Sequence, residues 1–184
     1  LDGLLTEVRL SETFRAGLFA GFRPDLLYAE NPQSLSIGGG YVALVTRVGD
    51  SLVVEQSIAG VGEYHDAIIS RESISLSGRL QKGNRWGINE SLEFDINRSW
   101  REVRTGSSVA LSNVYASGWM RLSRSARVTV SYDNRTNFRT FQNRSIADSV
   151  FDDHLYQGAR LMLESAIPWH CRLSGSVGMR KRPD

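Results

Sequence analysis

The stretch that decides the fold is residues 73–81, which read Ser-Ile-Ser-Leu-Ser-Gly-Arg-Leu-Gln. Its even positions are apolar or glycine, and its odd positions are polar or charged. Successive side chains of a β-strand point to opposite faces, so this period of two predicts a strand with one apolar and one polar face. The same alternation recurs at 91–97, 127–133 and 172–180, which predicts an all-β fold.

Working outward from these runs, we expect about ten antiparallel strands along the chain. Their approximate spans are 4–10, 13–23, 35–47, 51–61, 73–82, 86–97, 108–122, 127–135, 154–165 and 170–180. Most cover about 9–13 residues, whereas a tilted strand needs roughly 9–11 to cross a bilayer and strands of soluble proteins average roughly 5–6. Glu90 falls on the apolar side of its span, which points either to a bulge that shifts the phase or to an error in that span.

The connections between the predicted strands alternate strictly between short and long. Short turns are expected near 11–12, 48–50, 83–85, 123–126 and 167–169. Long links are expected at about 24–34, 62–72, 98–107 and 136–153. A meander with one tight end and one ragged end gives this pattern, which is typical of barrels with short turns on one side of a membrane and longer loops on the other.

The composition excludes several classes of protein. The 184 residues include 22 basic and 20 acidic side chains, without the basic stripe of a nucleic-acid-binding protein. No apolar run is long enough for a membrane-spanning helix. Cys171 is the one cysteine, which excludes an intramolecular disulfide and a cysteine-rich zinc site, and we expect neither a cofactor nor a metal. The chain starts at Leu1 and ends at Pro183-Asp184, and we expect it to be a fragment of a longer protein.

This rhythm of strands and loops resembles that of bacterial outer-membrane β-barrels, over nearly the whole chain. The resemblance implies an antiparallel up-and-down transmembrane β-barrel that forms one domain over 1–184 and belongs to a larger barrel. It places the protein in the bacterial outer membrane, with the lipid bilayer as its partner, small ions or solutes as cargo and no role for nucleic acid. Such barrels often finish on a strand with a terminal aromatic residue, and this chain departs from that pattern.

A barrel in lipid turns its apolar face outward and its polar face toward the lumen. The residues expected to face lipid include Phe14, Phe22, Leu76, Phe94, Val130, Tyr132 and Leu173. Eight basic and six acidic residues are expected to line the lumen: Glu7, Arg9, Arg15, Glu55, Arg79, Glu93, Asp95, Arg121, Arg127, Asp133, Arg160, Glu164, Arg172 and Arg180. The sequence therefore predicts a porin-like channel or membrane scaffold with a charged lumen and a slight preference for small anions.

Two alternatives stay open. An Asp–His pair can act as a general base, and outer-membrane proteases of the omptin type are similar in placing Asp and His groups on the extracellular rim. The candidates for such a hydrolase site are His65, Asp66, Asp152, Asp153 and His154. A soluble β-sandwich binding module also alternates, because one face of each of its sheets covers a core. The long loop from about 134 to 153 is expected either to fold inward or to bind a surface partner, or else to be a solvated loop.

Overall fold

A computed structural model describes residues 2–22, 35–147, 149–152, 155–167 and 171–181. Within these residues the chain forms ten β-strands and one short helix. The strands are β1 (Asp2–Arg9), β2 (Phe14–Phe22), β3 (Leu35–Val48), β4 (Leu52–His65), β5 (Ile68–Lys82), β6 (Trp86–Ile96), β7 (Val109–Arg121), β8 (Ala126–Thr136), β9 (Leu155–Ile167) and β10 (Cys171–Lys181), and the helix is α1 (Trp100–Thr105). The expected all-β fold and most of the expected strand bounds are confirmed.

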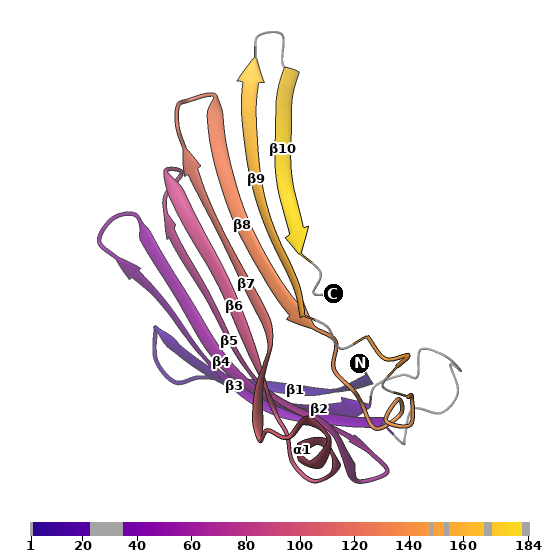
Figure 1. Cartoon of the computed structure of the whole chain (residues 1–184). Helices are drawn as coiled ribbons and strands as arrows, with labels where there is room; N and C mark the ends of the chain where they lie inside the picture. Colours follow the sequence, from indigo (N-terminus) through magenta and orange to yellow (C-terminus); the bar gives the residue numbers. More distant parts are fainter. Residues whose placement is uncertain (1, 23–34, 148, 153–154, 168–170, 182–184) are drawn as a thin grey trace.

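All ten strands belong to one antiparallel sheet in chain order, so each strand pairs only with its neighbours in the sequence. Figure 1 shows that the sheet is strongly curved and twisted, with β1 and β2 running at a steep angle to β9 and β10. The sheet is not closed into a barrel, because β1 and β10 are its two edges and do not pair with each other. No helix among the described residues is long and apolar enough to cross a membrane.

The expected long link at 62–72 is wrong. Strands β4 and β5 continue through most of it and are joined by the two residues Asp66 and Ala67. Both residues have positive φ, 47° and 64°, as the tight hairpin turn that suits twisted strands requires. The pairing register shifts between Glu63 and Tyr64. This irregularity interrupts the period of two, so the sequence pattern does not show that the strand continues to the hairpin. The link at 98–107 is long as expected, although it contains the unexpected helix α1.

The bulge expected near Glu90 lies elsewhere. Glu90 pairs regularly with Gly78 and Ala116, so it stays on the apolar face, where Gln56 Nε2 lies 3.4 Å from its Oε1. The register shift falls between Glu93 and Phe94, and the extra residue is Ser112 on β7. The charge at position 90 is therefore accommodated by a polar neighbour instead of by a change of phase.

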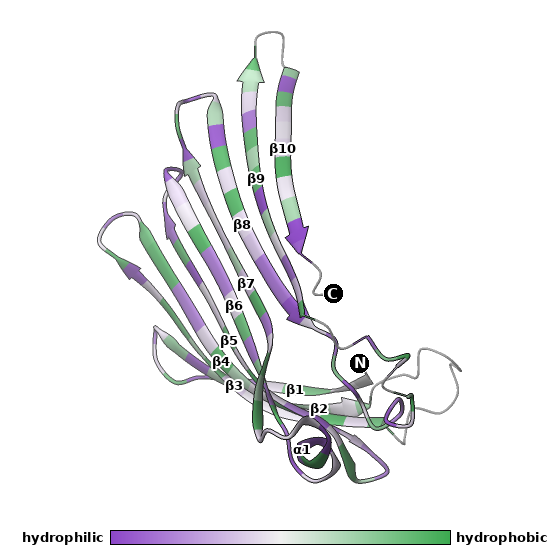
Figure 2. Ribbon diagram, viewed as in Figure 1, coloured by the Kyte–Doolittle hydropathy of each residue, from purple (hydrophilic) through white to green (hydrophobic). Residues whose placement is uncertain are grey.

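The two faces of the sheet differ as the alternation predicts, and Figure 2 shows hydrophilic and hydrophobic bands alternating along β8, β9 and β10. The pairing registers place all seven residues expected to face lipid on one face and all fourteen expected lumen residues on the other. We call these the apolar face and the polar face. Nothing in the described chain covers the apolar face. On either face, Leu35 is the one buried hydrophobic side chain among the described residues. A single sheet layer is not the two-sheet sandwich of the second alternative.

On the polar face, aromatic rings lie over glycines of the neighbouring strand. Gly17 pairs directly with Tyr41, Gly39 with Phe19, and Gly87 with Trp119. A Cβ atom added at each of these glycines would collide with the partner ring, at 2.5 Å from Trp119 Nε1 in the case of Gly87. The missing side chains let the large rings lie flat against the backbone, which is one way to fill the polar face of a curved sheet without crowding it.

The Gly87–Trp119 contact gives a stability prediction. We expect Gly87→Val to lower the free energy of unfolding by about 1–3 kcal/mol, because the ring must leave its position. The matched control is Gly175→Val, since among the described residues nothing lies within 4 Å of a Cβ atom added at Gly175. That change should stay within about 0.5 kcal/mol. Urea unfolding followed by Trp fluorescence measures both, and equal losses would contradict this account of Gly87.

Candidate functional site

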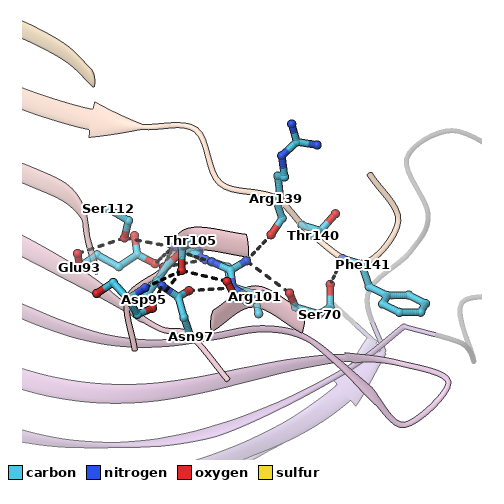
Figure 3. Close-up of polar contacts among 12 residues, drawn as sticks. Ser70, Glu93, Asp95, Asn97, Arg101, Thr105, Ser112, Arg139, Thr140 and Phe141 are labelled. Carbon is cyan, nitrogen blue, oxygen red and sulfur yellow. Dashed lines mark hydrogen bonds and ion pairs between the residues drawn. The ribbon is translucent and has the colours of Figure 1, made fainter. Parts of the chain in front are cut away.

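The candidate site lies on the polar face at the end of the sheet that carries α1 and the segment 137–152. We call this the loop end, and the opposite end, with its tight turns, the turn end. The segment 137–152, described except for residue 148, follows β8, and its residues Phe138 and Phe141 contact the sheet. The Arg71 guanidinium lies 3.5 Å from the centroid of the Phe138 ring, and the Phe141 amide donates a hydrogen bond to Ser70 Oγ at 3.1 Å (Figure 3).

A buried carboxylate, Asp95 on β6, organises the site. Its Oδ1 accepts hydrogen bonds from Arg71 Nε at 3.0 Å and Arg71 Nη2 at 2.6 Å, and its Oδ2 accepts one from Arg101 Nη2 at 2.5 Å. Arg71 Nη2 also lies 2.9 Å from Glu93 Oε1. Two cations thus face two carboxylates, and such an arrangement is stable in a buried place only because each charge is paired and hydrogen-bonded.

Helix α1 places Arg101 in contact with this cluster. Its last turn ends at Gly106, which has a φ of 67° and donates its N–H to Glu102 O at 2.9 Å, the left-handed cap that favours glycine. Trp100 Nε1 ties the helix to the sheet by donating to Ile69 O at 2.7 Å. Arg101 then donates from Nε to Asn97 Oδ1 at 3.1 Å and from Nη1 to the Arg139 carbonyl oxygen. One side chain therefore connects β6, α1 and the segment 137–152.

Burial and charge act in opposite directions on Arg101. Burial lowers the pKa of its guanidinium, and the charge of Asp95 raises it again, while the nearby Arg71 adds to the lowering. In the preceding loop, Arg98 donates from Nε to Glu72 Oε2 at 2.7 Å, and this hydrogen bond raises the pKa of Arg98. Both guanidinium groups stay charged at every pH a cell offers. We call the cluster of Arg71, Glu93, Asp95 and Arg101 the ionic clamp.

A pocket of about 430 Å³ opens beside the clamp. Its walls combine cations, rings and neutral polar groups, and its lining residues are Asp95, Asn97, Trp100, Arg101, Arg104, Thr105, Ala110, Leu111, Ser112, Thr136, Phe138, Arg139 and Phe151. The Arg139 guanidinium lies 4.0 Å from the centroid of the Phe151 ring. The described residues contain no group of three His, Cys, Asp or Glu side chains that could hold a metal ion.

Five of the predicted lumen residues belong to clusters at the two ends of the sheet. Glu93 and Asp95 belong to the ionic clamp at the loop end. Arg121, Arg127 and Arg172 lie at the turn end, on β7, β8 and β10. The clamp partners Arg71 and Arg101 were missed, since both fall in segments that the sequence assigned to long links. Arg101 lies six positions after Asp95 and cannot be seen to return to it until α1 is known.

The residues proposed for a hydrolase are not gathered into one described site. His65 Nε2 lies 3.5 Å from Asp66 Oδ2 in the β4–β5 hairpin, and the imidazole packs against Phe141 with ring centroids 5.3 Å apart. Asp152 accepts a hydrogen bond from Tyr156, and no described contact links it to His65. Asp153 and His154 lie outside the described residues.

No protein-family model, curated protein or solved structure matches the chain.

The clamp predicts the behaviour of one variant. We expect Arg101→Gln to lower the free energy of unfolding by about 3–5 kcal/mol, because it leaves a buried carboxylate short of a partner. Hydrogen exchange at the Phe141 amide should speed up in the same variant, since the segment 137–152 loses its anchor. Arg135 is an exposed arginine on β8. As a control, Arg135→Gln should change the free energy of unfolding by less than about 0.5 kcal/mol. Unchanged exchange at Phe141 in Arg101→Gln would show that the clamp does not hold this segment.

Proposed function

We propose that this chain is a section of a bacterial outer-membrane β-barrel whose polar face lines a charged lumen. In this proposal the barrel acts as a porin-like channel or membrane scaffold for small ions or solutes. The apolar face contacts lipid, and the segment 137–152 narrows the lumen at the loop end.

The observation that carries the proposal is the exposure of the apolar face. Leu18 is 71% exposed, Val130 54% and Leu173 64%, and these side chains come from strands β2, β8 and β10. Apolar side chains of all ten strands join the same surface. Soluble monomers rarely expose contiguous apolar patches larger than a few hundred Å², and nothing in the described chain covers this one. Lipid hydrocarbon is the environment in which such a face costs nothing.

The stagger of the strands supports the same proposal. A row of directly paired residues starts at Arg15 and runs through Ala43, Ser57, Ser77, Ser91, Tyr115, Asp133 and Gly158 to Arg180. Arg15 is the second residue of β2, whereas Arg180 is the tenth of β10. The row thus climbs eight residues over eight strand-to-strand steps, or one residue per strand. With a rise of about 3.3 Å per residue and about 4.8 Å between strands, this stagger corresponds to a tilt of about 35°, within the range of closed barrels.

Closure is the remaining requirement. An open sheet edge in hydrocarbon leaves unpaired N–H and C=O groups, which is why only closed barrels cross membranes as strands. The free edges here are β1 and β10. The proposal therefore includes further strands that pair with these edges and complete a barrel larger than the ten strands described.

Lipid contact predicts a difference between neighbouring residues of β5. We expect Leu76→Arg to lower the free energy of unfolding from phospholipid vesicles by about 2–4 kcal/mol, because a guanidinium near the bilayer centre is costly. Ser77→Arg places the same group on the polar face of the same strand and should cost less than about 1 kcal/mol. Urea titration in vesicles measures both. A protein that is monodisperse in water without detergent, with the two variants equal, would contradict the membrane proposal.

The lumen charge predicts a weak selectivity. The fourteen predicted lumen residues comprise eight cations and six anions, so this set has a small positive excess. We expect planar-bilayer recordings of the full-length protein to show a pore with a slight preference for small anions over cations. Recordings without any conductance would contradict the channel and leave only the role of a membrane scaffold. A clear cation preference would contradict the assignment of these charges to the lumen.

A further inference from the structure

Four arginines gather on the sheet at the turn end. Arg121 ends β7, Arg124 lies in the β7–β8 turn, Arg127 lies near the start of β8, and Arg172 lies near the start of β10. They line a pocket of about 200 Å³ together with Glu164. Four positive charges thus share one negative charge, in contrast to the balanced clamp at the loop end.

The pairing register brings like charges together, which is unfavourable unless an anion binds between them. Arg121 and Arg127 are directly paired across β7 and β8, and like charges in that position destabilise a sheet. Arg127 is directly paired with Glu164 on its other side, yet no ion pair within 4 Å joins any of these arginines to a carboxylate among the described residues. The four arginines therefore have only the carboxylate of Glu164 as a counter-charge in the pocket, and none of them forms an ion pair with it in the described chain.

The pocket is held in shape by its surroundings. Ser123 Oγ accepts hydrogen bonds from the amides of Ser125 at 3.2 Å and Ala126 at 3.0 Å, which fixes the β7–β8 turn. The carbonyl of Ser125 accepts a hydrogen bond from the Ala166 amide at 2.8 Å, which ties that turn to β9. The Arg127 guanidinium lies 4.0 Å from the centroid of the Trp119 ring, so its face is occupied and the N–H groups at its edge remain available.

We propose that this pocket binds a phosphate-like oxyanion, either inorganic phosphate or the phosphoryl group of a small dissolved solute. Guanidinium groups present planar forks of N–H donors that match the oxygens of phosphate, often in pairs. The pairing of Arg121 with Arg127 becomes favourable once a dianion lies between them. Arg121, Arg127, Glu164 and Arg172 all lie on the polar face, so a phosphate in water reaches them directly. The inference uses only these residues and holds whether or not the sheet lies in a membrane.

The test is a titration of the detergent-solubilised full-length protein with inorganic phosphate and with pyrophosphate, at constant ionic strength, by isothermal calorimetry. We expect binding that weakens at least tenfold in the double variant Arg121→Gln/Arg127→Gln. The control Arg79→Gln/Arg160→Gln removes the same charge from the same face outside the pocket and should change the affinity by no more than about threefold. Equal weakening in both double variants would overturn the site, because it would reflect only the overall charge of the face.

Glu164 provides a second variant with the opposite expected sign. Glu164→Gln removes the one carboxylate in the pocket and should tighten phosphate binding several-fold without any loss of cationic donors. Weaker binding in this variant, or no binding of either anion to the unaltered protein at millimolar concentration, would overturn the proposal.

A lipid headgroup is the other source of a phosphoryl group, and the lipid composition distinguishes it. The same titration is repeated in nanodiscs of phosphatidylcholine and of phosphatidylglycerol. We expect the same affinity in both, because the pocket faces away from the apolar face. Loss of phosphate binding only in phosphatidylglycerol would overturn the assignment to a dissolved phosphate.

Discussion

The structure depends on one constraint: a single β-sheet layer has two faces, and this chain supplies a partner for only one of them. The alternation of side chains sends the apolar residues of ten strands to the same side, where nothing in the described chain covers them. The polar side carries most of the charges of the strands, together with the segment 137–152 and α1. A soluble sheet would be stabilised mainly by the burial of its apolar face. Here the interior contacts are polar instead, and the buried residues include Asp95, Asn97 and Arg101.

The two ends of the polar face solve the problem of gathered charge in different ways. At the loop end the two cations of the clamp have carboxylate partners, and Asp95 joins Arg71 to Arg101 at 2.5–2.6 Å. The result is a rigid corner that holds the segment 137–152 against the sheet. At the turn end Arg121 and Arg127 are directly paired and Glu164 is their nearest acidic neighbour in register. The loop end is therefore stabilised by its paired charges, whereas the turn end carries the arginines proposed to bind an anion.

The sequence alone predicted the strands well because the period of two is a local property of the chain, set by residues such as Leu76 and Phe94 that alternate with polar neighbours. It failed where the period is broken. The bulge at Glu63/Tyr64 hid the hairpin at Asp66-Ala67, and the six residues of α1 are too few to show a helical period. The clamp could not be predicted either, since Arg71 and Arg101 meet Asp95 only after those two segments are folded.

The connectivity of the sheet has a consequence for how such a chain can change over time. Every strand is bonded only to the strands before and after it, so a hairpin could be duplicated or lost at either edge without altering the pairing of the rest. Each such event would widen or narrow the sheet by two strands while leaving the register of the remaining strands unchanged. The ten strands from Asp2 to Lys181 can therefore be regarded as an extensible series, in which the number of strands can vary while the stagger between neighbours is kept.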